Sequence, residues 1–399
     1  MNLTVSLEAR FLKTTDQAIW TETGLDNTFW QRYLDVFDSV EVVARVQDIS
    51  RVLPNHKRAD GERIHFIPLP YYIGPYQYLL NAFKIDQITK AIIKKAEVVL
   101  LRTPGQVSHC LFRHLKNNQH PYGVEVVGDP YDVFAPGVID HPFRLFFRWW
   151  STRQLCNHCQ SALGAAYVTK DTLQRRYPNA LYSTYYSSID IKEEAYATSP
   201  RIAFGLKGFY TLVFIGSLEQ LYKGPDLLID AVGLCNRRNL NIKLNIIGEG
   251  RFKPQLKAQV SRKGLSESVT FMGQLPAGGA VRDMLMKSDL FVLPSRTEGL
   301  PRAMIEAMAC GLPCIGSNIG GIPELLSQED LVPAGNAPAL AEKIGETITQ
   351  PHRMMAMAAR NLEKSKEYRS DILDKRRQAF YLHLRNKTEE WLQERREKH

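Results

Sequence analysis

No stretch of 18 consecutive apolar residues occurs in the 399-residue chain, so a membrane-spanning helix is not expected. The first residues also lack the basic, apolar and small-residue order of a secretory signal peptide. Six cysteines are present and include one C-x-x-C pair, Cys156 and Cys159, without the second pair or spaced histidines of a zinc site. We therefore expect these two on one helix face, free thiols throughout, and a reducing, cytoplasmic location.

Motifs for nucleic-acid binding are missing as well. The chain carries a net charge of +9, from 51 basic and 42 acidic residues, and such a charge suits nucleic acid, an anionic ligand or a membrane surface. Because no recognition-helix, zinc-finger or RNA-binding motif accompanies the charge, nucleic acid is the least favoured of the three partners. The other two remain open.

Strands and helices alternate through the second half of the chain, joined by short connections that contain glycine. This order is typical of a doubly wound parallel sheet in an α/β protein. We expect strands at 212–215, 244–247, 269–273, 290–293 and 314–316, and helices at 252–263, 280–287 and 302–309. The first half is compatible with a second such sheet, with strands at 3–7, 40–45, 64–67, 98–101 and 123–128 and a helix at 78–95.

The most informative segment is 294–324, which reads PSRTEGLPRAMIEAMACGLPCIGSNIGGIPE. Pro301 stands where a helix would begin, and a helix N-terminus offers free N–H groups to a phosphate or another anionic oxygen. Glu306 is a lone carboxylate among apolar residues of that helix. Burying it unpaired would cost several kcal/mol, so it needs a partner, and a ligand hydroxyl would serve.

Four residues of the second half fall at the carboxyl ends of expected strands, namely Gly216, Gly248, Gly273 and Glu298. Ligands of open parallel sheets lie beyond these ends. The four residues should therefore cluster in space although they are far apart in sequence.

Glu298 and Glu306, with seven residues between them and a G-x-P turn behind them, resemble the E-x7-E motif of retaining GT-B glycosyltransferases, the large family 4 (glycosyl transferases group 1). The competing interpretation is a plain amphipathic helix with a salt-bridged Glu. The resemblance implies that Glu298 meets the donor sugar and that Glu306 grips the ribose of the nucleotide. It also implies that the loop Gly299, Leu300 and Pro301 offers backbone N–H groups to the sugar and diphosphate.

A second motif of that family is G-R-L followed by K-G, with the Arg and the Lys both on the donor diphosphate. Here Gly216-Ser217-Leu218 precedes Lys223-Gly224. Lys223 matches, and a lysine there can neutralise charge on the leaving phosphate. Ser217 replaces the Arg, so part of the phosphate site departs from the family pattern, and Lys207 or Arg302 could compensate.

The resemblance implies a GT-B fold: two Rossmann-like doubly wound domains facing a cleft, with a C-terminal helix crossing back to the first. We place the acceptor-binding domain at 1–185, a linker at 186–208 within the irregular stretch 182–206, the nucleotide-sugar domain at 209–365 and the returning helix at 366–399. That helix has an apolar stripe at Leu373, Phe380, Leu384 and Trp391, although an exposed tail helix is the alternative. In the first domain, Asp129 or Asp132 is the candidate for contacting the reacting sugar or the acceptor.

An aromatic and arginine-rich stretch at 141–153 reads HPFRLFFRWWSTR. Such a stretch can lie in a bilayer interface and meet anionic headgroups. The candidates are Arg144, Arg148, Trp149 and Trp150. Packing of the aromatics inside the first domain is an equal alternative.

We therefore expect a metal-independent retaining hexosyltransferase, without cofactor, that moves a sugar from a nucleotide donor to a lipid-linked or saccharide acceptor in cell-surface polysaccharide synthesis. No Asp-x-Asp pair is present to carry a metal for the diphosphate. Retaining members are thought to use the departing phosphate as the base, so no protein nucleophile is required. The alternatives are a non-catalytic GT-B subunit and a GT-B sugar-nucleotide epimerase.

Overall fold

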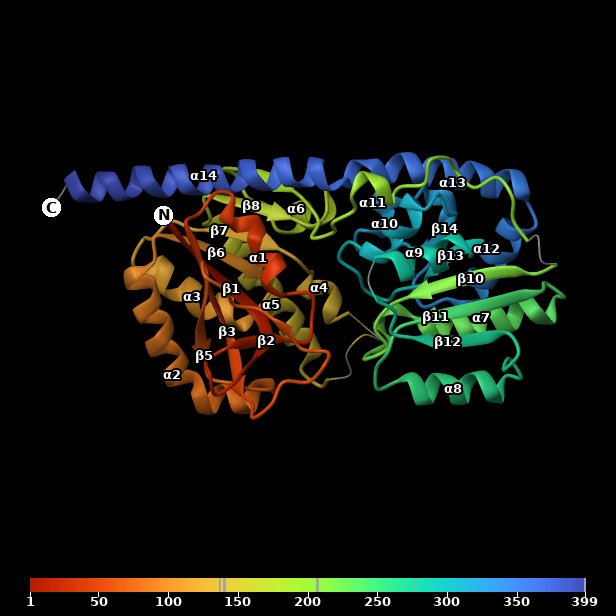
Figure 1. Cartoon of the computed structure of the whole chain (residues 1–399), viewed down its shortest axis with the longest axis horizontal. Coiled ribbons are helices and arrows are strands. Elements are labelled where there is room, and N and C mark those ends of the chain that lie inside the picture. The colour runs from red at the N-terminus through yellow and green to blue at the C-terminus, as the bar shows by residue number, and fades with distance from the viewer. Residues whose placement is uncertain (136–137, 139–140, 206–207, 277, 398–399) are drawn as a thin grey trace. The chain divides into compact units, whose positions relative to one another are not determined.

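The computed structural model describes residues 1–399 except 136–137, 139–140, 206–207, 277 and 398–399. The chain divides into two compact units. The first unit comprises Met1–Pro130, Trp149–Tyr186 and Asp374–His399, and the second comprises Tyr131–Arg148 and Ser187–Leu373. Each unit has its own sheet (Figure 1).

A nine-stranded sheet forms the centre of the first unit. Seven strands run parallel in the order β5-β3-β1-β6-β7-β8-β9. Their bounds are β1 Asn2–Lys13, β3 Ser39–Asp48, β5 Ile64–Leu69, β6 Val98–Thr103, β7 Gly123–Val126, β8 Gly164–Tyr167 and β9 Ser183–Tyr185. The helices are α1 Asn27–Leu34, α2 Gly74–Lys95, α3 Gln106–Asn117, α4 Pro130–Val133, α5 Arg144–Gln160 and α6 Thr172–Arg176. Of these, α4 from Tyr131 onward and α5 up to Arg148 fall in the second unit.

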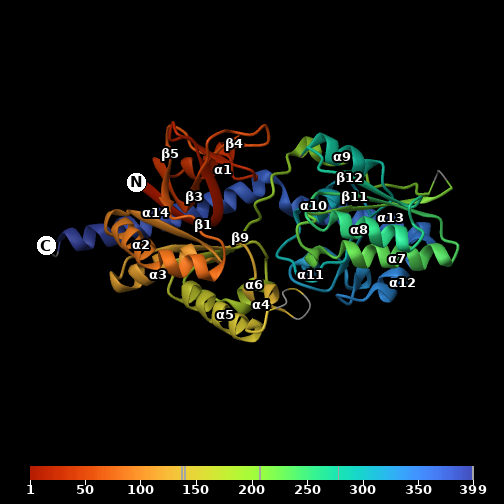
Figure 2. The same ribbon diagram turned by 90° about the horizontal axis from the view of Figure 1, so that it is seen from below.

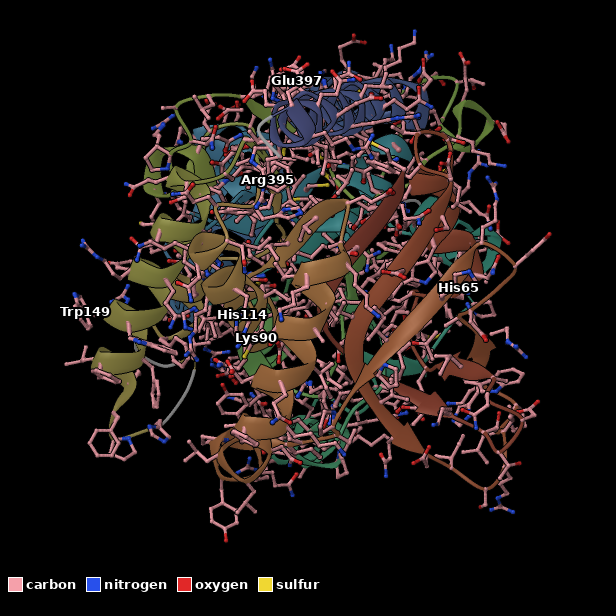
Figure 3. All side chains as sticks on the ribbon, turned by 90° about the vertical axis from the view of Figure 1, so that its left-hand side faces the viewer. His65, Lys90, His114, Trp149, Arg395 and Glu397 are labelled. Carbon is pink, nitrogen blue, oxygen red and sulfur yellow. The ribbon has the colours of Figure 1, made fainter. Side chains whose placement is uncertain are left out.

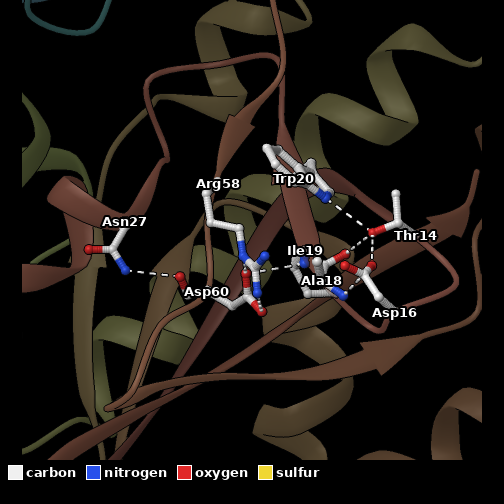
Figure 4. Close-up of polar contacts among 8 residues, drawn as sticks. All are labelled: Thr14, Asp16, Ala18, Ile19, Trp20, Asn27, Arg58 and Asp60. Carbon is white, nitrogen blue, oxygen red and sulfur yellow. Dashed lines mark hydrogen bonds and ion pairs between the residues drawn. The ribbon is translucent and has the colours of Figure 1, made fainter. Parts of the chain in front are cut away.

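Two short antiparallel strands, β2 Ile19–Thr21 and β4 Lys57–Arg58, extend the sheet beside the end of β1. Polar contacts stabilise this extension (Figure 4). The Ile19 amide donates to Asp60 (3.2 Å), the Asn27 side chain donates to the Asp60 carbonyl (2.9 Å), and the Trp20 indole donates to Thr14 (3.2 Å). Neither strand could be predicted from the sequence, because runs of two or three residues carry no periodicity.

The second unit is built on a six-stranded parallel sheet in the order β12-β11-β10-β13-β14-β15. The strands are β10 Tyr210–Ile215, β11 Ile242–Ile247, β12 Val269–Gly273, β13 Leu290–Leu293, β14 Cys314–Ser317 and β15 Leu331–Val332. The helices are α7 Pro225–Arg237, α8 Lys253–Arg262, α9 Gly279–Met286, α10 Arg302–Ala309, α11 Ile322–Leu325, α12 Ala337–Ile348 and α13 Pro351–Ser365. The doubly wound sheet predicted for this half is confirmed.

The last helix, α14 Ser370–Glu397, begins in the second unit and packs into the first unit from Asp374 onward (Figure 1). Leu373, Phe380 and Leu384 of its apolar stripe are fully buried. A Cβ placed on Gly123 of β7 would lie 2.3 Å from Leu384 Cδ1, so glycine allows the helix to lie directly on this strand. The returning helix is confirmed, and the alternative of an exposed tail helix is wrong.

A buried carboxylate joins α14 to the sheet of the first unit. Glu125 on β7 accepts hydrogen bonds from the hydroxyls of Tyr186 (2.8 Å), Tyr381 (2.7 Å) and Tyr33 (3.2 Å), and it pairs with Arg102. Burial alone would raise the pKa of Glu125, but the Arg102 charge and the tyrosine hydrogen bonds hold the pKa below its ordinary value. Glu125 is therefore ionised and fully paired.

Three further predictions concern the rest of the chain. The stretch 182–206 was expected to be irregular, but Ser183–Tyr185 forms the edge strand β9 beside β8. Strand pairing uses backbone hydrogen bonds, so a polar segment can form an edge strand without an apolar pattern in its sequence. All six cysteines are free, as predicted, and Cys156 and Cys159 lie together on α5. Over the residues that the structure describes, none of the helices combines the length and the apolar character needed to cross a bilayer.

Candidate functional site

An ion pair between Lys223 and Glu298 marks the candidate site in the second unit. The Lys223 Nζ lies 3.1 and 2.9 Å from the two carboxylate oxygens of Glu298, and the Ser295 hydroxyl donates to the same carboxylate at 3.0 Å. Lys223 ends a turn of 3-10 helix, Leu221–Lys223, after β10, and Glu298 lies in the loop after β13, the neighbouring strand. The Lys223 and Glu298 side chains are only 16% and 10% exposed. Two opposite charges are thus held together at the carboxyl end of the sheet.

Glycines pack against each other at the ends of β10, β11 and β12. A Cβ on Gly248, whose φ is +145°, would lie 1.9 Å from the Gly216 carbonyl oxygen. The Gly248 amide donates to the Gly273 carbonyl at 2.8 Å. A Cβ on Gly216 would lie 2.5 Å from the Lys223 side chain. The predicted clustering of the three glycines is confirmed, and side chains at Gly216 or Gly248 would block the close approach of these turns.

The loop that carries Glu298 is held on both sides. A Cβ on Gly224, with φ at +71°, would lie 2.1 Å from the Pro294 carbonyl oxygen, and one on Gly320 would lie 1.9 Å from the Glu298 carbonyl oxygen. Arg296 makes two hydrogen bonds to Asp226 (2.9 and 2.6 Å), a bidentate geometry that fixes both partners. We did not predict this support from the sequence, although the Gly320-Gly321 pair was a usable signal.

Ser217, which occupies the position of the family's Arg, is exposed and accepts a hydrogen bond from the Glu219 amide (3.2 Å). It therefore shapes the turn after β10. Of the two cations expected to compensate, Lys207 lies outside the described residues. Arg302 is exposed on the first turn of α10, and its charge acts on Glu306.

Glu306 faces a cavity of about 290 Å³ in the second unit. The cavity is lined by Asp190, Ile191, Ala195, Gly278, Gly279, Val281, Arg282, Leu285, Glu306, Ala309 and Cys310. Burial raises the pKa of Glu306, while the charge of Arg302 opposes the rise. Within the described part of the chain, its carboxylate makes no hydrogen bond or ion pair with a protein group. The competing interpretation, that Glu306 forms a salt bridge, is therefore not supported, because no described cation lies at ion-pair distance from its carboxylate.

The N-terminus of α10 lies between the two glutamates. Pro301 precedes its first residue and, within the described residues, no side chain caps the helix. Leu300 and Pro301 are buried, and the Gly299 carbonyl accepts from the Gly321 amide at 2.7 Å. The first N–H groups of α10 can therefore bind an anion.

Asp129 and Asp132 are buried, with 4% and 5% of their surfaces exposed. The Tyr177 hydroxyl donates to Asp129 Oδ1 at 2.6 Å, and Arg176 pairs with Oδ2. Both oxygens of Asp129 are thus engaged inside the first unit. A contact between Asp129 and a sugar stays a prediction, and it would require Asp129 to exchange one of these partners.

The aromatic stretch 141–153 is divided between two environments. Trp149 is 64% exposed and Phe146 53% exposed, while Trp150 is half-buried with its ring 5.8 Å from the His109 ring. Arg148 lies over the Tyr131 ring (3.5 Å) and donates to its carbonyl (2.9 Å), and Arg144 donates to the Phe134 carbonyl (3.4 Å). Trp150 thus packs partly inside the first unit, while most of the Trp149 side chain is exposed. Membrane binding here stays a prediction.

Comparison with known proteins finds similarity to glycosyltransferases. Residues 210–350 match the model of the family glycosyl transferases group 1. The protein CapJ of Staphylococcus aureus is 27% identical over 82% of this chain and 81% of its own length. The amylovoran biosynthesis glycosyltransferase AmsK of Erwinia amylovora is 36% identical over 30% of this chain and 31% of its own length.

Among solved structures, HepE of Anabaena in complex with UDP and glucose superposes with a TM-score of 0.63 at 15% identity, over 99% of this chain and 100% of HepE. This likeness shows the GT-B fold. The family resemblance predicted from the motifs around Lys223, Glu298 and Glu306 is likewise confirmed, and glycosyl transfer is the reaction class that the comparisons support.

Proposed function

We propose that this GT-B protein, whose residues 210–350 belong to glycosyl transferases group 1, transfers a hexosyl group with retention. The donor would be a nucleotide-diphosphate sugar, and the acceptor a hydroxyl of a lipid-linked or saccharide acceptor. The observation that carries this proposal is the contact of Lys223 with Glu298, in the loop that leads to the N-terminus of α10, where no described side chain caps the helix. HepE, which shares the fold, holds UDP and glucose in its structure, and the name of AmsK supports a role in polysaccharide synthesis.

In this proposal the donor diphosphate replaces Glu298 as the partner of Lys223. Lys223 and the N–H groups of α10 then oppose the charge that develops on the leaving phosphate, and such oriented donors are the usual large electrostatic contribution to catalysis. Glu298, released from Lys223, orients the sugar and supports positive charge at its anomeric carbon. Glu306 accepts hydrogen bonds from the ribose hydroxyls in its cavity.

Retention requires that the acceptor oxygen attack the anomeric carbon from the same face of the sugar from which the leaving phosphate departs. The departing phosphate would take the proton of the acceptor hydroxyl, so no protein base is needed. We propose that neither a metal nor another cofactor takes part. Among the described residues, no group of three or more His, Cys, Asp or Glu side chains is placed to hold a metal ion. Full activity after treatment with EDTA is the expected result.

Incubation of the purified protein with a panel of radiolabelled sugar nucleotides, with and without membrane lipid extract, tests the proposal. Label should move from one donor to an acceptor. Conversion of the donor into an epimer without any acceptor would instead identify an epimerase. Binding without turnover of any sugar nucleotide would identify a non-catalytic subunit.

Glu306→Gln should weaken nucleotide affinity by about tenfold and leave thermal stability unchanged, because a neutral amide is a poorer acceptor for ribose hydroxyls than a carboxylate. Calorimetry with UDP, GDP and ADP measures the effect and also identifies the base. Glu342→Gln on α12, away from the cavity, is the control. Loss of stability with unchanged affinity would show that Glu306 serves the fold instead.

We also propose that the exposed aromatics at the start of α5 contact an anionic membrane surface, which would place the protein peripherally on the cytoplasmic leaflet. Trp149→Ser should lower binding to anionic vesicles without lowering the melting temperature, because Trp149 is largely exposed. Trp150→Ser is the matched control and should mainly destabilise the protein. Unchanged vesicle binding by Trp149→Ser would refute this part of the proposal.

A further inference from the structure

The first half of α2 exposes large apolar side chains on one face. Tyr76, Leu79, Leu80 and Phe83 are 74%, 69%, 70% and 76% exposed. Their spacing is i, i+3, i+4 and i+7, which puts all four on one side of a helix. Ile73, directly before α2, is 55% exposed and extends the patch. We call this face, residues 73, 76, 79, 80 and 83, the α2 stripe.

The opposite side of α2 packs against the hydrophobic core of the first unit. Ile85, Thr89, Ile92 and Ile93 are its buried residues. Tyr78 lies against α3, where its hydroxyl is 3.5 Å from the Cys110 sulfur. Figure 2 shows α2, α3 and α5 next to one another in the first unit. The α2 stripe is therefore a second apolar face of a helix that already has a core-facing one.

Cations accompany the α2 stripe along the same helix. Lys84, Lys90 and Lys94 are exposed, and Figure 3 shows Lys90 on the side of the first unit that faces the viewer. None of these three lysines is in an ion pair with a described residue. A helix face with large apolar groups and exposed lysines has the composition of an interfacial membrane helix. In such a helix the apolar side chains enter the acyl region of the leaflet, and the lysines contact anionic headgroups.

A hollow lies beside the α2 stripe. Its volume is about 200 Å³, and Lys84 and Ile88 of α2 line it together with Lys13, Val46, Asp48, Pro68, Leu69 and Pro70, which come from the ends of β1, β3 and β5 and the residues next to them. Lys13 pairs with Asp48 at 3.3 Å, but the Asp48 side chain is 84% exposed. Because Asp48 is mostly in solvent, it can turn away from Lys13, whose side chain is 24% exposed, and a phosphate oxygen can take its place.

We propose that α2 is a membrane-docking helix that binds an anionic phospholipid leaflet. The α2 stripe enters the acyl boundary, Lys90 and Lys94 contact headgroup phosphates, and one lipid phosphate binds between Lys13 and Lys84. This inference deepens the membrane contact of the proposed function and rests on it, because it adds a second docking surface for the same kind of partner; docking itself is measured without any sugar or acceptor. It also differs from the contact proposed for Trp149 on α5.

Flotation of the full-length protein with vesicles tests the proposal. The vesicles contain phosphatidylcholine alone or phosphatidylcholine mixed with phosphatidylglycerol. Wild-type protein should float with the anionic vesicles and be released by salt, because ions screen the lysines. Leu80→Ser combined with Phe83→Ser should lower binding at least about tenfold, since each large apolar group contributes transfer free energy. Lys84→Gln combined with Lys90→Gln should lower binding to the anionic vesicles only.

The control is Leu181→Ser, which changes an equally exposed leucine (71%) of the first unit, near the opposite edge of the sheet from β5. It should float like the wild type. Equal flotation of the Leu80 and Phe83 double variant and the wild type would overturn the proposal, even if Trp149→Ser reduces binding. A wild-type dimer that dissociates in that double variant, without vesicle binding, would also overturn it, because a second copy would then cover the α2 stripe.

Discussion

Lys223→Ala should lower turnover of the sugar donor by at least about a hundredfold, the usual loss when one oriented donor to a developing negative charge is removed. The Lys223 ammonium is the positive charge held at the end of β10, within 2.9 Å of Glu298. In the variant the leaving phosphate would lack this counter-charge. Steady-state rates with the donor found in the radiolabel panel measure the effect.

The matched control is Lys263→Ala, which removes another paired lysine of the same unit, 3.0 Å from Asp230. Lys263 directly follows the last residue of α8, and Asp230 lies on α7, so neither belongs to the glycine turns at the ends of β10, β11 and β12. The control should keep wild-type turnover. Wild-type turnover in Lys223→Ala itself would mean that the K-G motif, Lys223-Gly224, carries no catalytic charge here.

Glu125→Ala should destabilise the first unit by about 3–5 kcal/mol, because it leaves the buried Arg102 charge without its partner. Three tyrosine hydroxyls lose an acceptor in the same variant. Chemical denaturation followed by tryptophan fluorescence gives the change in free energy of unfolding. Tyr381→Phe, which removes one hydroxyl only, should cost about 1 kcal/mol.

The same carboxylate predicts a pH dependence. The folded protein holds the pKa of Glu125 below its ordinary value, so this group stabilises the fold at pH above that ordinary value. The contribution is lost as the pH falls through the lowered pKa and Glu125 becomes protonated. Wild-type stability should therefore fall on acidification more steeply than that of Glu125→Gln. An equal pH slope for both would show that Glu125 is not charged in the fold.

The second unit was more predictable from sequence than the first. Its strands are short apolar runs that end in glycine, and β12, β13 and α10 have the predicted bounds. In the first unit β8 reads GAAY, which carries neither alternation nor β-branched residues, so its pattern does not predict a strand. Its burial comes from residues far away in the sequence, such as Phe380 of α14, which packs on Gly164. Strand β9 was missed because the stretch STY is polar.

Within the site, the positions that follow strands could be predicted, because parallel strands bring their carboxyl ends together. The contact of Arg296 with Asp226 could not, since the two residues are 70 positions apart and only the loop geometry joins them. The α2 stripe was hidden for a different reason. A helix with an apolar pattern is normally assigned to the core, and the sequence does not distinguish a core face from a face left exposed.

Hydrogen exchange of the protein with and without UDP, GDP or ADP is the most direct test of the donor site. A bound diphosphate should slow exchange of the amides at residues 216–223, 248–251 and 295–303, where the glycine turns and the N-terminus of α10 lie. The amides of α12, Ala337–Ile348, should exchange at an unchanged rate. Slowed exchange elsewhere, with none in those three segments under any of the nucleotides, would contradict the assignment of this site to a nucleotide-sugar donor.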